Sequence, residues 1–146
     1  MDIGEVVRQS VAVIVATRDE ELRPEVCRAW GPVLTGDETR LTLCVEHSPE
    51  TARNLAAGSP LTAMLARLTS QVTLGLTGQV VDVAPLTDEH RAAVDAHIER
   101  FVAEGASVGV PETTARSLAG PELVSVTIAV TERTDETPGA ETGRRV

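Results

Sequence analysis

Six short apolar segments separated by turn residues limit the folds open to this chain. They cover residues 11–17, 22–34, 40–46, 60–68, 71–83 and 123–131. Residues 123–131 alternate apolar with small or polar side chains, which is typical of a β-strand with one buried face. No strand, helix and strand follow one another with matched spacing, and this argues against a parallel doubly wound sheet. Closure removes the exposed edges of short strands, so we predict a mainly β fold, a six-stranded antiparallel β-barrel with flanking helices.

Helical signals fall between these segments. Residues 2–9, 87–105 and 111–118 have helical patterns, and the sharpest signal is the start of residues 48–57. Ser48 is a preferred N-cap residue, Pro49 fits the first helical position, and Glu50 suits the positive end of the helix dipole. Two glycines in the fifth segment, Gly75 and Gly78, predict bends where the barrel turns a corner.

The length of 146 residues is enough for one domain with one core. We predict a barrel domain over residues 1–133 and an extended tail over residues 134–146, because the tail is polar and rich in Gly and Thr. The chain contains one Trp, one Phe and no Tyr, so the predicted core is aliphatic.

Charge and composition exclude several functions. The net charge of −9 argues against nucleic-acid binding, which depends on clustered basic residues. Every basic residue is Arg, and the absence of Lys excludes Schiff-base chemistry and lysine-dependent phosphate loops. No signal region and no apolar run of about 18 residues is present, so we expect a cytoplasmic protein without a membrane segment.

The predicted helix start at Ser48 is the first candidate site. Free N–H groups and the helix dipole can bind phosphate, and Ser48, Thr51 and Arg53 would add hydroxyl donors and a positive charge. Glu50 places a negative charge in the same turn, so ordinary helix capping is the competing interpretation. His47 lies at the preceding strand end, where its side chain would face a ligand.

The second candidate site is on the second strand. Alternation places Arg28 and Trp30 on the same face, where they would hold an anionic planar ligand or form a surface cation–π pair. His90 and His97 are too far apart for one metal ion and are predicted to be surface residues. Cys27 and Cys44 lack metal-ligand spacing and are predicted to be small buried hydrophobic residues.

Four stretches together resemble the small members of the pyridoxamine 5′-phosphate oxidase-like, flavin-binding split-barrel family. Residues 13–19 with 22–24 resemble its opening hairpin, and residues 48–55 resemble the helix after its third strand. Residues 71–81 resemble a strand ending in Gly-x-Val or Gly-x-Ala. Residues 134–140 with Gly143 and Arg144 are similar to the tail of one subgroup.

This resemblance implies a split barrel that forms a homodimer with flavin mononucleotide (FMN) at the subunit interface. Arg28 matches the basic position of the second strand, and Ser48 matches the hydroxyl at the turn. Glu50 and Thr51 stand where cofactor-binding relatives carry an Arg-Lys pair, which weakens the expected phosphate contacts. The family's residues for pyridoxamine phosphate have no counterpart, so that oxidase reaction is not expected.

Two hypotheses follow. The first is an FMN-dependent redox protein that acts as a homodimer on a small substrate. Arg28 would bind phosphate, Ser48, Thr51 and Arg53 would assist, and Trp30 or His47 would touch the ring or substrate. The second is a non-catalytic dimer that has lost FMN or binds a deazaflavin or a tetrapyrrole. A structural or stress-related dimer is a third, weaker alternative.

Overall fold

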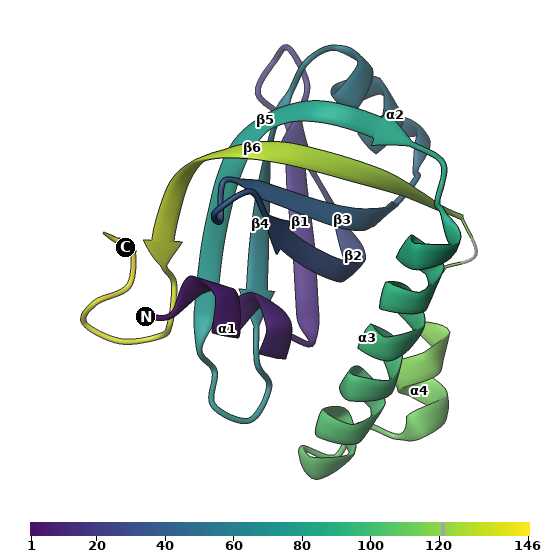
Figure 1. The fold of residues 1–146 in the computed structure, drawn as a ribbon, viewed down its shortest axis with the longest axis vertical. Coiled ribbons are helices and arrows are strands. Elements are labelled where there is room, and N and C mark those ends of the chain that lie inside the picture. Colours follow the sequence, from purple (N-terminus) through teal and green to yellow (C-terminus); the bar gives the residue numbers. More distant parts are fainter. Residues whose placement is uncertain (121) are drawn as a thin grey trace.

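Six antiparallel strands form a closed barrel in the computed structural model, which describes residues 1–120 and 122–146. The strands are β1 (Ala12–Arg18), β2 (Pro24–Thr35), β3 (Arg40–Glu46), β4 (Pro60–Ala66), β5 (Thr73–Ala84) and β6 (Leu123–Asp135). They pair in the order β3-β2-β1-β4-β5-β6, and β3 also pairs with β6 to close the barrel. Figure 1 shows this barrel, and the predicted fold class is confirmed.

Helices cover the two ends and one side of the barrel. They are α1 (Ile3–Gln9), α2 (Pro49–Ala56), α3 (Asp88–Ser107) and α4 (Glu112–Ser117). Figure 1 shows α1 and α2 at opposite ends of the barrel, while α3 and α4 lie together along its side. None of the helices formed by the described residues is long and apolar enough to cross a membrane.

Aliphatic side chains fill the barrel, as the composition predicts. Along β1 and β4 the buried residues alternate with residues that face outward. The fully buried core includes Val15, Leu41, Leu43, Leu61, Leu65, Leu74, Leu76 and Ile128. Ile3 and Val7 of α1 and Leu55 of α2 join this cluster, which is why these short helices are held against the barrel ends.

A second apolar cluster lies outside the barrel, between β2 and α3. Trp30, Val94 and Phe101 are its large side chains, and the rings of Trp30 and Phe101 meet edge to face with centroids 6.0 Å apart. His97 is fully buried beside them, so the prediction of a surface histidine at this position is wrong. The prediction failed because most side chains of α3 are polar or exposed, whereas His97 lies on the single buried face of this helix, with Val94 and Phe101.

The predicted bend at Gly78 coincides with a shift in the pairing register. β5 and β6 change register between Thr77 and Gly78 and again between Val80 and Asp82. A Cβ atom at Gly78 would overlap the carbonyl oxygen of Ala129 on β6, so only glycine allows this approach.

Strand β6 is longer than the strand predicted from its alternating apolar residues, 123–131. It extends beyond Thr131 because Glu132 to Asp135 continue the backbone pairing with β5, which does not require apolar side chains. Beyond it, the backbone N–H of Glu136 donates to the carbonyl oxygen of Thr73 (2.8 Å). Two residues, Arg144–Arg145 (β7), then pair with the end of β6.

Candidate functional site

The first candidate site is the start of α2, where Ser48 acts as the helix cap. Its Oγ atom accepts the backbone N–H of Thr51 (3.1 Å), and Pro49 occupies the first helical position. The predicted cap is therefore confirmed. The backbone N–H of Ala52 donates to the carbonyl oxygen of Ser48 in the first helical hydrogen bond.

The inner face of α2 is directed at the barrel end. Thr51 is only 1% exposed, and its hydroxyl group donates to Sγ of Cys27 (3.8 Å). Asn54 is also buried, and its Nδ2 atom donates to Oγ1 of Thr17 on β1 (3.0 Å). These side chains connect the helix to β1 and β2 and do not face solvent.

The outer face of α2 borders an acidic cavity of about 560 Å³ at the β1–β2 turn. Its charged lining residues are Asp19, Glu20, Glu21, Arg23, Glu25, Glu50 and Arg53. Arg53 pairs with Glu50 (3.8 Å), and Arg23 pairs with Asp19 (2.7 Å). The backbone N–H and the guanidinium of Arg23 donate to Asp19 and lower the pKa of that carboxyl, which stays ionised. The cavity therefore carries a surplus of negative charge.

His47 lies at the end of β3, just before the cap, and is exposed. Its backbone N–H donates to the carbonyl oxygen of Glu122 (3.2 Å), which fixes the chain path between β3 and α2. Its side chain is exposed at this end of the barrel, and a contact with a ligand there stays a prediction.

The second candidate site is the outward face of β2, β1, β4 and β5, which carries Arg28. Residues that pair directly across antiparallel strands lie on the same face of the sheet. The register therefore gives one row of neighbours across β2, β1, β4 and β5: Arg28, Ile14, Met64 and Gly75. The neighbouring row contains Val26, Ala16, Thr62 and Thr77.

On these four strands neither row has a carboxylate, although the chain has a net charge of −9. The second row continues to Glu132 on β6, which pairs with Thr77. Val26 is 57% exposed and Ile14 is 40% exposed, so the face is apolar and open. Among the described residues, the half-buried Arg28 has no ion-pair partner. The sequence pattern points to Arg28 but not to its neighbours, because these are brought beside it by strand pairing across β1 and β4.

Trp30 does not join Arg28 at an open site. It is 1% exposed, and its ring lies 5.3 Å from that of His97, measured between centroids. Strand alternation does put both side chains outside the barrel, as predicted, but α3 covers this end of β2. Trp30 is therefore a packing residue of this chain.

The two cysteines are unreactive in this environment. Burial raises the pKa of the Cys27 thiol, and raises that of Cys44 to about 11, so both remain protonated at neutral pH. The described residues include no cluster of three or more His, Cys, Asp or Glu side chains suited to a metal ion.

FMN can be tested against these two regions. Its ring system is planar and largely apolar, and the outward face offers an apolar surface with one unpaired guanidinium. Its phosphate group is a dianion, and the start of α2 offers it a surplus of carboxylates instead of free donors. The outward face offers an exposed apolar surface for a ring, and the start of α2 does not suit the phosphate.

No family model matches the sequence, and no curated protein matches it significantly. Solved structures match its fold over most of its length. HupZ of Group A Streptococcus is 15% identical, with 97% of each chain covered and a TM-score of 0.58. An F420 reductase is 16% identical, covering 92% of this chain and 97% of its own, with a TM-score of 0.59.

A pyridoxamine 5′-phosphate oxidase-related, FMN-binding protein from Nostoc punctiforme is 11% identical, with a TM-score of 0.51. The alignment covers 95% of this chain and 84% of that one. At sequence identities of 11–16%, the similarity to these structures is a similarity of fold. The similarity to these structures and the closure of the barrel by β3 and β6 show that the chain has the split-barrel fold found in pyridoxamine 5′-phosphate oxidase-like proteins.

Proposed function

We propose that this protein is a homodimer that binds a flavin-type cofactor and transfers electrons or hydride to a small substrate. The observation that carries the proposal is the outward face of β2, β1, β4 and β5, where Arg28 lies unpaired beside Ile14 among the described residues. The fold similarity to an FMN-binding protein and to an F420 reductase supports the same ligand class.

A second copy of the chain is the proposed cover for this face. The exposed side chains of Ile14 and Val26 would lose contact with water on association, together with Met64, the partner of Ile14 on β4. This burial of apolar surface is favourable. The four strands have no carboxylate in these two rows, and Glu132, which follows Thr77 on β6, pairs with Arg145 (3.7 Å). Two copies of Arg28 would repel each other across it, and a bound electron-rich ligand would offset that repulsion.

In this proposal the protein binds and orients the ligand, while the cofactor supplies the redox reactivity. Arg28 would hold an electron-rich edge of the ring, and His47 would face the ligand from the end of β3. Ser48 and Thr51 contribute indirectly, because their side chains fix α2 against the barrel. Arg53 remains paired with Glu50 on the outer face of the helix.

Titration with flavins, followed by quenching of flavin fluorescence, tests the ligand. Arg28→Ala is expected to weaken binding by about tenfold, the loss that corresponds to one charged hydrogen bond. Arg91→Ala is the matched control, because Arg91 is an exposed arginine of α3 with no ion pair among the described residues. If no flavin or deazaflavin binds the wild-type protein, the redox proposal is wrong.

Sedimentation velocity tests the dimer. Ile14→Asp would place a charge on the proposed interface and is expected to yield monomers, whereas Val108→Asp should leave the dimer intact. Val108 is similarly exposed, at 48%, but lies at the end of α3. A wild-type protein that is monomeric at high concentration would contradict the proposal.

The acidic cavity beside α2 argues against binding of the FMN phosphate and so supports one alternative. In this alternative the protein is a dimer that has lost FMN and binds a deazaflavin or a tetrapyrrole without catalysis. The redox proposal predicts a bound ligand that a small electron donor reduces and a small electron acceptor reoxidises on the protein. Saturable binding of a tetrapyrrole, without binding of any flavin, would support the alternative.

A further inference from the structure

We propose that the α2 end of the barrel excludes phosphate, so that a flavin bound to this chain gains nothing from its phosphate group. The identity of the ligand as a flavin rests on the function proposed above. The exclusion itself rests on α2 and the acidic cavity next to it.

The backbone donors at the start of α2 are already occupied. Pro49 has no N–H group, and the N–H of Thr51 donates to Oγ of Ser48. The N–H of Ala52 donates to the carbonyl oxygen of Ser48. Within the described part of the chain, this leaves the N–H of Glu50 as the one unoccupied donor of the first turn. Phosphate sites at helix starts use several such groups together.

The side chains that would replace these donors point elsewhere. The hydroxyl group of Thr51 donates to Cys27, and the amide of Asn54 donates to Thr17, both toward the barrel. Both residues are buried, at 1% and 6% exposure. Asn54 borders the cavity, but its amide donates to Thr17, and Thr51 does not line the cavity. Neutral side-chain donors directed at a phosphate are therefore few on this side of α2.

The charges of the cavity repel an anion. Five carboxylates line it, against the two arginines Arg23 and Arg53. Each arginine already pairs with carboxylates, Arg23 with Asp19 and Glu21, and Arg53 with Glu50. A phosphate dianion entering here would meet a surplus of like charge.

The same carboxylates suit a different chemical group. Ionised carboxylates only accept hydrogen bonds, and hydroxyl groups donate them. Glu20 and Glu25 have no ion-pair partner among the described residues and can accept from a ligand. A neutral hydroxyl group is therefore tolerated beside these carboxylates, whereas a phosphate dianion is repelled.

Calorimetric titration of the full-length protein with riboflavin and with FMN tests this inference. The two dissociation constants are expected to agree within about threefold, which corresponds to less than 1 kcal/mol. Glu50→Arg should tighten FMN binding by about tenfold and leave riboflavin binding unchanged. Glu112→Arg is the matched control, because Glu112 lies in the first turn of α4 and pairs with Arg116 of the same helix. It should change neither constant.

A titration with inorganic phosphate, followed by the amide NMR signals of Glu50 and Thr51, tests the exclusion without any flavin. No saturable shift is expected in the wild-type protein at millimolar phosphate. A saturable shift, or FMN binding more than tenfold tighter than riboflavin, would overturn the inference and leave the proposed function intact. If neither flavin binds and phosphate causes no shift, the proposed function fails and the exclusion stands.

Discussion

The backbone N–H of Gly31 donates a hydrogen bond of 2.8 Å to Nδ1 of His97, which connects β2 to the middle of α3. Because Nδ1 accepts, the ring proton is on Nε2, which donates to the carbonyl oxygen of Val11 (2.9 Å). The neutral imidazole of α3 thus connects to Gly31 on β2 and to Val11 just before β1. Protonation of Nδ1 would remove the acceptor of the Gly31 N–H. Desolvation by burial, together with the charge of Arg100, lowers the pKa of His97 from 6.5 to about 4.

The stability of the protein should therefore fall in mild acid. Between pH 6.5 and about 4 the unfolded chain binds a proton at His97 that the folded chain does not, so unfolding becomes easier as the pH falls. The loss should reach about 3 kcal/mol near pH 4. Urea denaturation at a series of pH values measures it.

The matched variant is His97→Gln, which removes the titrating group. It should be less stable than the wild type at pH 7.5, and the difference between the two proteins should shrink toward pH 4. A difference that stays constant over this range would show that His97 does not cause the pH dependence.

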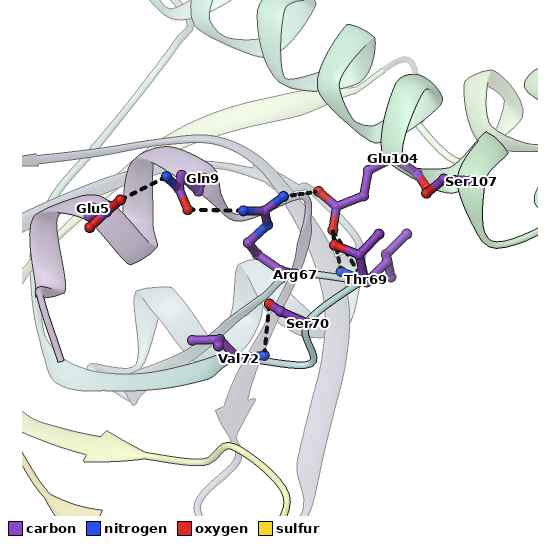
Figure 2. Close-up of polar contacts among 9 residues, drawn as sticks. Glu5, Gln9, Arg67, Thr69, Ser70, Val72, Glu104 and Ser107 are labelled. Carbon is purple, nitrogen blue, oxygen red and sulfur yellow. Dashed lines mark hydrogen bonds and ion pairs between the residues drawn. The ribbon is translucent and has the colours of Figure 1, made fainter.

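Glu104 should be essential for the attachment of α3 to the β4–β5 turn. Its carboxylate accepts hydrogen bonds from the Arg67 guanidinium, the Thr69 hydroxyl and the backbone N–H of Thr69 (2.9 Å), as Figure 2 shows. It also accepts the backbone N–H of Leu68 (2.7 Å). Glu104→Ala would leave these donors unpaired and should cost about 2–4 kcal/mol. Glu99→Ala, which breaks an exposed ion pair with Arg116, should cost less than about 1 kcal/mol.

Glu104 should also contribute to acid sensitivity. Burial raises its pKa, but the hydrogen bonds from Thr69, Leu68 and Arg67 outweigh burial and hold the pKa below 4.5. This stabilisation is complete above pH 4.5 and is lost as the pH falls through the folded-state pKa. Hydrogen exchange at Leu68 and Thr69 should accelerate in Glu104→Ala, and unchanged protection there would contradict the assignment.

Gly78→Ala should be strongly destabilising, because the added methyl group would overlap the carbonyl oxygen of Ala129. Forced overpacking of this kind costs about 1–3 kcal/mol or more. Gly4→Ala in α1 is the control, since its new methyl group would meet only the movable ends of Arg8 and Glu38 and the side chain of Asp2. Thermal unfolding of the two variants separates these expectations, and equal melting temperatures would contradict them.

Trp30 should be shielded from solvent in the folded protein. It is the only Trp of the chain and is 1% exposed, so acrylamide should quench the native fluorescence weakly and that of the unfolded chain strongly. Efficient quenching of the native protein would show that Trp30 lies at an open site, as the sequence alone suggested.

The barrel could be predicted from the sequence because each strand has its own local pattern. Residues 40–46 are predictable as one strand and Ser48 as a cap, since both signals are contained in a few consecutive residues. The burial of His97 is not predictable in this way, because it depends on Gly31 and Val11, which are distant in the sequence. The same limit applies to Arg28, whose surroundings arise from Ile14 and Met64 on other strands.

The pairing of β3 with β6 has a consequence for the order of folding. Arg40 pairs with Ala129, and nearly all of the intervening chain must be synthesised before the two strands can meet. Contacts between distant segments slow folding because a long loop must close first. During translation the edge of β3 stays open until the C-terminal strand leaves the ribosome, and we expect a chain truncated before β6 to aggregate through that edge.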